Sequence, residues 1–349
     1  ANKFTFVWKK SIERYHAKLI EKSNAIYDEL LQNEIIPEIQ RESEEQLSIP
    51  ELAQVIQAVD EVVKEYDQQI EASADVPERK QLRSERKYPK QLRKQLIELT
   101  LRKQKYEKDF EIFGARNSYS KTDEDATFMR MKDDYMKNGQ LKAGYNVQIA
   151  TEGQYALAYS IFPNPTDTLT LIPFLNEIEQ HYFDLPKHIV ADAGYGSEQN
   201  YNDILVNRKR EALITYNLYL KEQKKKYKQN VFNTANWAYD QEADTYTCPN
   251  NQLLHFKHHS VRTDRNGFTR QFKIYECENC TDCPLRSSCT KAKEGNHRKL
   301  MINEKWEQQK EYVRAKLSDE KTGAIYRKRK IDVEPVFGFL KANLRFTRF

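Results

Sequence analysis

The sequence has little glycine, few cysteines and no long apolar run. Only 10 of its 349 residues are glycine, and none precedes position 114, which favours long uninterrupted helices in the first third of the chain. No apolar stretch approaches the roughly 20 residues that a membrane-spanning helix requires. The first residues also lack the apolar core and cleavage site of a secretory signal peptide. We therefore expect no membrane association and a cytoplasmic location.

The motifs of several large enzyme classes are missing as well. No GxxxxGK or GxGxxG pattern occurs, so nucleotide hydrolysis and dinucleotide redox chemistry have no support. The histidines and serines form no nucleophile elbow of the hydrolase type. The remaining candidates for functional residues are the charged side chains and the few cysteines.

Positive charge is unevenly distributed along the chain. The net charge is only +5, from 57 Lys and Arg against 52 Asp and Glu, but "KEQKKKYK" (221–228) and the last thirty residues are strongly basic. Such clusters fit a polyanionic partner. A solvated basic surface is the equally open alternative.

Apolar spacing predicts three helices in the first 115 residues. They cover 11–35, 49–72 and 88–113, with breaks around Pro50 and at "SADVPERK". Antiparallel helical arms or a coiled coil are the expected form of this region.

Residues 116–217 change to an α/β pattern. Strands are predicted within 126–132, 143–151, 155–162, 187–192 and 211–217, with helices at 166–183 and 197–209. Thr166 or Asp167 is the expected cap of the first of these helices. Residues 218–302 are predicted to be β-rich, with a hairpin around "DRNG" (264–267). Two helices, 303–317 and 318–344, close the chain within a final region, 303–349.

Asp192 follows directly on a predicted buried strand and precedes Ala193 and Gly194. A carboxylate in this place would be held rigidly at the edge of a sheet, as a hard divalent cation requires. The alternative is that Asp192 caps the following helix, although Ser197 is better placed for that duty.

The basic stretch "YRKRKIDVEPVFGFLK" (326–341) contains one glutamate among its cations, Glu334. Tyr326, Lys330 and Glu334 are four residues apart, so a helix would place them along one side. Pro335 predicts a kink or a helix restart. A cationic surface helix with an incidental Glu–Lys pair remains the alternative.

The five cysteines lie close together in the sequence. "CENCTDCPLRSSC" contains two overlapping Cys-x-x-Cys steps, and such spacing, with no export signal, indicates a reducing compartment and a tetrahedral zinc site rather than disulfides. Reduced, partly buried thiols are the alternative. The candidate ligands are Cys248, Cys277, Cys280, Cys283 and Cys289, with His297 as a weaker one.

Several motifs together resemble a known family. "TDEDATFMRMK", "GYNVQIA", "VADAGYGSEQNY" and "YRKRKIDVEPVFGFLKANLRFTRF" resemble, in the same order, the DDE transposases of bacterial insertion sequences, in the branch with a Tyr-Arg-Glu-Lys signature and a β-rich insertion before its Glu. The resemblance spans 116–349, and residues 1–115 correspond to a helical spacer between early elements of the catalytic fold.

The resemblance implies a fold, a chemistry and residue roles. The expected fold is α/β, an RNase H-like mixed sheet with a long N-terminal helical insertion and a β-rich, cysteine-containing insertion. Asp192 would be the second acidic residue and Glu334 the third, together holding Mg²⁺ or Mn²⁺ for strand cleavage and transfer on transposon ends and target DNA, as a possible homodimer. The DNA-contacting signature falls on Tyr326, Arg329 and Lys341; Arg329 lies five residues before Glu334, one more than usual, and Lys330 occupies the usual position.

The first acidic residue of the family has no counterpart in this sequence. It normally lies in an Asp-Gly-Thr motif on the first strand, and no such motif occurs here. Asp123 and Asp125 are the alternative candidates for this role, although the resemblance places their segment in a separate element of the family fold. We therefore expect a fragment that lacks the first, central strand and is inactive alone. Two other hypotheses stand beside it: a non-enzymatic nucleic-acid-binding protein with a zinc-stapled module, and a structural coiled coil, which leaves the strand motifs unexplained.

Overall fold

The computed structural model describes residues 5–130 and 141–346. It divides into two compact units, residues 1–144 and 145–349, each with its own hydrophobic clusters. All predicted site residues lie within the described ranges, whereas Met131 and Lys132 of one predicted strand lie outside them. Within these ranges no helix combines the length and apolar composition that a membrane span needs.

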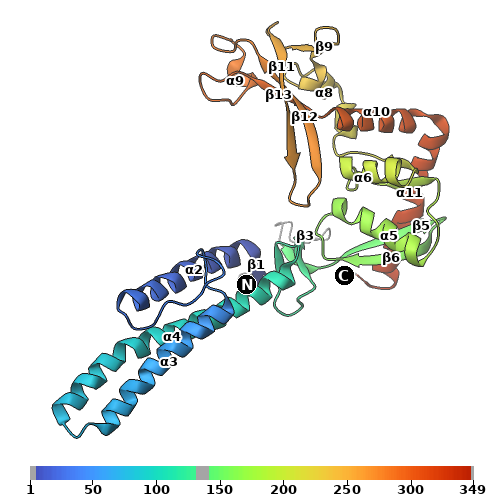
Figure 1. Ribbon diagram of the computed structural model, residues 1–349. Coiled ribbons are helices and arrows are strands. Elements are labelled where there is room, and N and C mark those ends of the chain that lie inside the picture. Colours follow the sequence, from blue (N-terminus) through green and yellow to red (C-terminus); the bar gives the residue numbers. More distant parts are fainter. Residues whose placement is uncertain (1–4, 131–140, 347–349) are drawn as a thin grey trace. The chain divides into compact units, whose positions relative to one another are not determined.

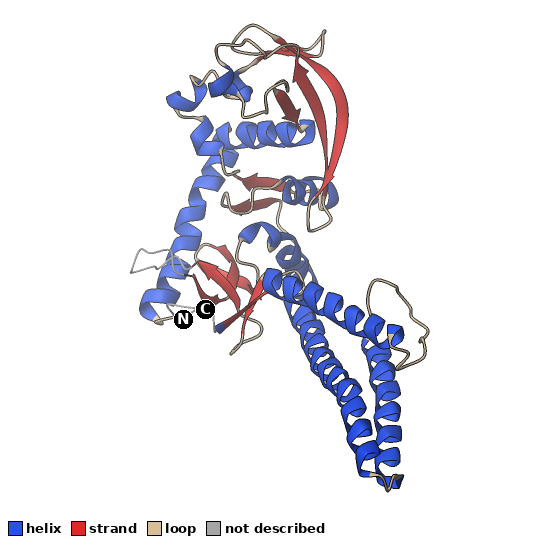
Figure 2. Ribbon diagram, turned by 90° about the vertical axis from the view of Figure 1, so that its left-hand side faces the viewer, coloured by secondary structure: helices blue, strands red, loops and turns tan. Residues whose placement is uncertain are grey.

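The first unit is mainly a helical hairpin. Its elements are β1 (Phe6–Trp8), α2 (Lys9–Gln32), α3 (Ile49–Ala72), α4 (Val76–Phe113), β2 (Ser118–Ser120), β3 (Thr127–Arg130) and β4 (Leu141–Gly144). Helices α3 and α4 run antiparallel, with α2 beside α4 (Figures 1 and 2). The strand pairs β1–β2 and β3–β4 are both antiparallel.

Helix α3 begins where its sequence predicts. Ser48 and Glu51 form a capping box: the Glu51 N–H donates to Ser48 Oγ at 3.4 Å, and the Ser48 N–H donates to Glu51 Oε2 at 2.6 Å. These two bonds satisfy backbone donors that a helix start leaves open. Pro50 occupies the first turn, where its missing N–H costs nothing.

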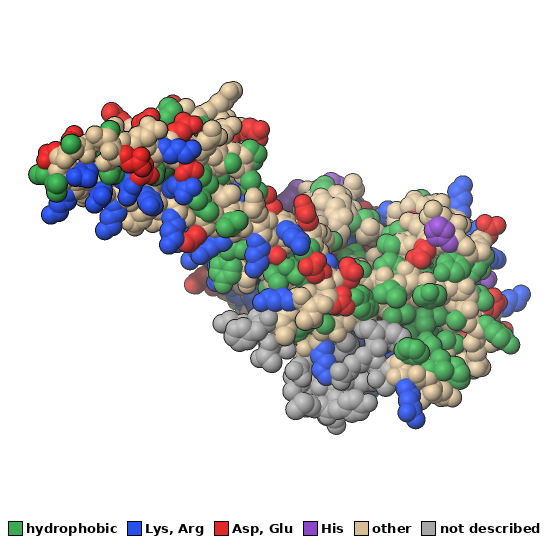
Figure 3. All heavy atoms as spheres, turned by 90° about the horizontal axis from the view of Figure 1, so that it is seen from below, with side chains coloured by type: hydrophobic (Ala, Val, Ile, Leu, Met, Phe, Trp, Pro, Cys, Tyr) green, Lys and Arg blue, Asp and Glu red, His purple; other side chains and the backbone are tan. Residues whose placement is uncertain are grey.

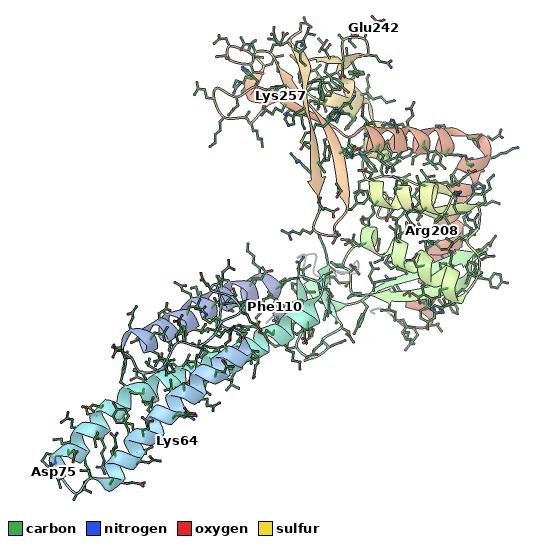
Figure 4. All side chains as sticks on the ribbon, viewed as in Figure 1. Lys64, Asp75, Phe110, Arg208, Glu242 and Lys257 are labelled. Atoms are coloured by element: carbon green, nitrogen blue, oxygen red, sulfur yellow. The ribbon has the colours of Figure 1, made fainter. Side chains whose placement is uncertain are left out.

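The predicted start of the third helix is wrong by a dozen residues. Only Ser73–Asp75 separates α3 from α4, with Asp75 at the turn (Figure 4). The sequence prediction interpreted Pro77 as part of a break, but the proline lies in the first turn of α4, where proline is tolerated. Pro89 is inside the same helix and buried.

The second unit combines short strand pairs, a curled antiparallel sheet and helices. Its strands are β5 (Asn146–Glu152), β6 (Tyr155–Phe162), β7 (His188–Ala191), β8 (Glu211–Ile214), β9 (Ala238–Asp240), β10 (Thr245–Thr247), β11 (Leu253–Thr263), β12 (Thr269–Cys277) and β13 (Lys299–Ile302). Its α-helices are α5 (Leu171–His181), α6 (Glu198–Asn202), α7 (Tyr219–Glu222), α8 (Lys225–Lys228), α9 (Arg286–Cys289), α10 (Glu304–Ser318) and α11 (Glu320–Gly338). Short 3₁₀ turns occur at Asp167–Leu169 and Thr234–Asn236, and π-helical segments at Asp203–Asn207 and Phe339–Asn343.

The strands of the predicted mixed sheet pair two by two. In the part of the chain that is described, β5 pairs antiparallel with β6 and β7 pairs parallel with β8, and no backbone ladder joins the two pairs. The mixed α/β class is therefore confirmed, whereas one continuous mixed sheet is not what these strands form. Backbone pairing requires a strand directly alongside, and the described residues place none between β5 and β7.

Helix α11 packs against both strand pairs. It contacts β5, β6, β7 and β8 and follows α10 (Figure 1). The expected helix restart at Pro335 does not occur, because α11 continues to Gly338 before the π-helical segment; the alternative, a kink at Pro335, stays a prediction. The core beneath α5 contains Ile178, Ile189 and Ile214. Arg208, labelled in Figure 4, forms ion pairs with Glu179 of α5 and with Asp203, the first residue of the π-helical segment. It therefore links the two elements.

The β-rich region forms a five-stranded antiparallel sheet in the order β13-β12-β11-β10-β9. The predicted "DRNG" hairpin joins β11 to β12. The Asp264 carboxylate accepts bonds from the Asn266 and Phe268 N–H groups at 2.9 and 3.1 Å, and Gly267 has a φ of +82°. That left-handed conformation is one that glycine adopts without strain.

Candidate functional site

Asp192 lies at the carboxyl end of β7, as predicted. Ala191, the last residue of β7, is paired with Ile214, the last residue of β8. Asp192 is half-buried, and its Oδ1 accepts the N–H of Gly194 at 2.8 Å. This bond fixes one carboxylate oxygen on the turn that follows the strand.

Asp192 is not the cap of α6. Ser197 occupies that position, and its Oγ accepts the N–H of Asn200 at 3.2 Å. The carboxylate of Asp192 is therefore not engaged at a helix start. The capping alternative is wrong, and the metal-ligand role of Asp192 stays a prediction.

Asp167 also does not act as the predicted helix cap. Neither Thr166 nor Asp167 caps α5; the Asp167 Oδ1 instead accepts bonds from Asn146 Nδ2 at 2.8 Å and Gln148 Nε2 at 3.2 Å. The 3₁₀ turn that precedes α5 aims the side chain at β5, where two amides bind it. Asn146 and Gln148 alternate in "GYNVQIA", so they share one face of β5. This polar alternation was the signal that sequence reasoning missed.

Asp167 and Asp192 converge on Gly194. A methyl group added to Gly194 would lie 3.0 Å from Asp167 Oδ2 and 3.0 Å from Asp192 Oδ1. The two oxygens are therefore no farther apart than twice that distance. Two carboxylates so close repel each other unless a cation or a proton lies nearby.

Tyr195 lies within the field of this acidic pair. Its hydroxyl donates to Gln148 Oε1. Burial raises the pKa of Tyr195, the charges of Asp167 and Asp192 raise it further, and Arg329 opposes them. Tyr195 therefore stays a neutral hydrogen-bond donor, and Arg329 of α11 is close enough to act on the same site.

The first half of the signature on α11 faces the strand ends. Tyr326 and Thr215, the residue after β8, share a hydrogen bond of 3.1 Å between their hydroxyls. The Arg329 guanidinium lies 5.8 Å from the centroid of the Tyr326 ring, and its buried Nε has no hydrogen-bond partner among the described residues. Lys330 is exposed. Of the two basic residues that the sequence left open, Arg329 is the one turned inward.

Glu334 lies farther along α11 and is exposed. In the described part of the chain it makes no hydrogen bond or ion pair. No three His, Cys, Asp or Glu side chains in those ranges form a ready ligand set for a metal ion. The acidic pair that the fold brings together is thus Asp167 with Asp192, and the metal-ligand role of Glu334 stays a prediction. Lys341 lies in the π-helical segment after α11.

All five cysteines line one cavity in the β-rich region. They are free thiols, and Arg286 and Arg298 line the same cavity. Burial raises the pKa of Cys289, and the neighbouring thiols of Cys248, Cys280 and Cys283 act in the same direction. His297 does not line the cavity; its Nδ1 accepts the N–H of Cys280 at 3.1 Å.

Two kinds of bond organise the walls of this cavity. The Arg298 N–H donates to the sulfur of Cys280 at 3.3 Å. The Arg286 guanidinium donates to the carbonyls of Cys280 at 3.1 Å and of Lys293 and Asn296 at 3.0 Å each. Arg286 therefore holds the loop after α9 against the cysteine segment.

Comparisons with known proteins agree with the sequence resemblance. No curated protein and no solved structure matches the chain. Residues 247–349, which include α11 and Glu334, match the family model described as "Transposase DDE domain". By this match, the C-terminal part of the chain is similar to a DDE-type transposase domain, which supports the sequence resemblance.

Proposed function

We propose that this chain belongs to the machinery that cuts and joins DNA strands in transposition, with its reactive centre at the ends of β7 and β8. The observation that carries the proposal is the convergence of Asp167 and Asp192 at Gly194, beneath a helix that lies in the matched transposase domain. Oxygen ligands of this kind suit Mg²⁺ or Mn²⁺.

The donor set fits a divalent cation. Asp167 Oδ2 and Asp192 Oδ1 face the same point, while the other oxygen of Asp167 is held by two amides. Glu334 would be the third ligand, supplied by α11. When bound, divalent ions held by these residues would supply Lewis acidity for an in-line displacement at phosphorus.

The remaining residues would position DNA. Arg329 carries a buried Nε with no partner in the described ranges and a charge that acts on Tyr195 beside the acidic pair, so its guanidinium suits a phosphate beside the cleaved bond. Lys330 and Lys341 would hold flanking phosphates, and Tyr326 would hydrogen-bond or stack next to the cut end. Because the sequence contains no Asp-Gly-Thr motif, we expect cleavage only from a chain that supplies this further carboxylate.

The test is iron-directed cleavage of the protein backbone. Fe²⁺, supplied in place of Mg²⁺ with ascorbate and peroxide, generates radicals that cut the chain close to its binding site. We expect cuts beside Asp167, Asp192 and Glu334, suppressed by excess Mg²⁺ and lost in Asp192→Asn. Asp184→Asn, at an exposed position, is the matched control. Cuts that survive in Asp192→Asn would remove this residue from the site, and absence of a cut beside Glu334 would remove Glu334.

A second test separates the enzyme from a non-enzymatic DNA-binding protein with the same zinc-stapled module. A chain extended upstream through an Asp-Gly-Thr motif should nick transposon-end DNA in Mg²⁺, and Asp192→Asn and Glu334→Gln should not. Equal activity in all three proteins would contradict the catalytic assignment, whereas DNA binding without Mg²⁺-dependent nicking would favour the binding protein.

We also propose that the cysteine cavity holds one structural Zn²⁺. The support is the convergence of thiols from two segments, the turn after β10 and the segment 277–289. Cys248, Cys280, Cys283 and Cys289 are the proposed ligands. Cys277 is set apart because its thiol donates to the Asn279 carbonyl at a distance of 3.6 Å. Four thiolates around Zn²⁺ carry a net charge of −2, which Arg286 and Arg298 offset at the same cavity.

Metal analysis of the purified chain tests the zinc site. We expect one zinc per chain in the wild type and in Cys277→Ser, and its loss in Cys289→Ser. Reconstitution with Co²⁺ should give the absorption of a tetrahedral thiolate site in the first two proteins alone. Iron in place of zinc, or equal loss in both variants, would contradict the assignment.

A further inference from the structure

The helical unit carries a row of cations that have no partner among the residues that the structure describes. Helix α4 contains 12 Lys and Arg against 6 Asp and Glu, whereas α3 contains 1 against 6. Figure 3 shows Lys and Arg side chains gathered along one edge of the helical hairpin and acidic side chains along the other. The two helices thus have opposite charge, and the positive one has a surplus.

Part of the positive charge on α4 neutralises α3. Arg86 forms an ion pair with Asp67, and Arg93 forms one with Asp60. The two arginines are seven residues apart, as are their two partners. This repeat places both ion pairs on the side of α4 that adjoins α3.

Another set of cations lies on a different side of α4. Its members are separated by three or four residues, so they form one stripe along the helix, and all are exposed. We name this set the stripe of α4; it consists of Lys80, Arg83, Lys87, Lys90 and Lys94. In the described part of the chain these five side chains make no hydrogen bond and no ion pair.

The stripe lies opposite the packed side of α4. The buried residues of the helix include Leu92, Leu96 and Leu99, which at 100° per residue project roughly 165° from the stripe. Packing therefore does not explain the cations. Like charges three and four residues apart cost a few tenths of a kcal/mol per pair, so the arrangement opposes the stability of the helix that carries it.

We propose that this stripe binds the phosphate backbone of duplex DNA. From Lys80 to Lys94 it is straight and about 21 Å long at 1.5 Å per residue, which matches roughly six base pairs of duplex at 3.4 Å each. Four of its five members are lysines, which act as point charges on phosphates and read no bases. The stripe would bind DNA without sequence preference. It would do so outside the strand-end site, the name we give to Asp167 and Asp192 at the end of β7. This inference rests on the proposed function, because the choice of DNA as the partner comes from that function.

The test compares two variants with the same change in net charge. Arg83→Gln/Lys87→Gln/Lys90→Gln removes three stripe cations, and Lys10→Gln/Lys18→Gln/Lys22→Gln removes three exposed cations from α2. Affinity for a short duplex of arbitrary sequence is measured by fluorescence anisotropy across a series of salt concentrations, and circular dichroism checks the helix content. Glutamine keeps the helix propensity of both sets.

We expect the stripe variant to bind at least tenfold more weakly at low salt. Its salt slope should fall by about 1 for each phosphate that the substituted side chains no longer neutralise, while the α2 variant stays near the wild type. Equal weakening of both variants would show that the stripe is not the DNA-binding surface, although the chain binds DNA. Failure of the wild-type chain to bind duplex at low salt would also contradict DNA binding by the stripe. The iron-directed cleavage tests the strand-end site independently of either result.

Discussion

The helical hairpin and the strand-end site place their charges in different ways. In α3 and α4, spacing along two straight helices decides which charges meet, as with Arg93 and Asp60. At the strand ends, Asp167 and Asp192 come from separate loops and meet where Gly194 leaves room for them. The hairpin therefore tolerates substitution at most exposed positions, whereas the site depends on a few tight turns.

The largest effect is expected at Gly196, in the turn after β7. A methyl group there would lie 2.2 Å from the Thr215 carbonyl oxygen and 2.9 Å from the Tyr216 Cα. Backbone cannot yield as a side chain can, so Gly196→Ala should destabilise the second unit by about 3 kcal/mol or more. Urea unfolding measures this. Gln95→Ala, on the exposed side of α4, should change stability far less. An equal loss of stability in both variants would contradict the expected difference between the hairpin and the turn after β7.

Gly194→Ala should lower divalent-ion affinity more than it lowers the stability of the fold. Its new methyl group would press only on the ends of the Asp167 and Asp192 side chains, 3.0 Å away. These side chains can rotate, so unfolding should change by about 1 kcal/mol, while the oxygens separate and divalent-ion affinity falls roughly tenfold or more. Calorimetric titration with Mn²⁺ measures the affinity. Unchanged Mn²⁺ binding would show that the pair does not act as one site.

Within the hairpin, paired and unpaired cations should respond with opposite signs. Arg93→Gln removes the ion pair with Asp60, a pair about one-third exposed, and should cost about 0.5–1 kcal/mol. Arg83→Gln removes a member of the stripe and should be neutral or stabilise by a few tenths. Thermal unfolding of each variant gives the sign. A loss in both would mean that Arg83 has a partner in the folded protein.

The smallest expected effect is on the pH dependence of stability, through Glu211 at the start of β8. The hydrogen bond from Lys316 lowers the pKa of Glu211, and the charges of Lys316 and Lys187 act in the same direction. A lowered pKa means that the folded state favours the carboxylate. The stabilisation is therefore complete above the unfolded pKa, near 4.5, and disappears as the pH falls through the folded value. Glu211→Gln should flatten the acid side of the stability profile. An unchanged profile would mean that this pair adds nothing.

Sequence patterns predicted local elements well where the signal is local. The helix at 49–72, predicted from its apolar spacing, and the hairpin at 264–267, predicted from its turn sequence, occur at the predicted residues. The start of α4 was missed because a proline in a first turn has the same appearance in sequence as a proline in a loop. The role of Asp167 was missed because its partners, Asn146 and Gln148, lie on a different strand.

The choice between Arg329 and Lys330 shows the same limit. One residue of sequence separates them, which on a helix is a rotation of 100°. Only the packing of α11 against the strand pairs decides that Arg329 faces Tyr195 while Lys330 faces solvent.

The sequence alone determined the helical hairpin, the family resemblance, the strand that ends at Asp192 and the clustering of the cysteines, because each depends on spacing between neighbours in the chain. The tertiary structure alone decided that Asp167 joins Asp192, that Arg329 points inward and that the stripe of α4 is exposed, with no hydrogen bond or ion pair to any described residue. Those outcomes depend on which elements pack together, and no local pattern encodes the distance between two side chains that arrive from different elements.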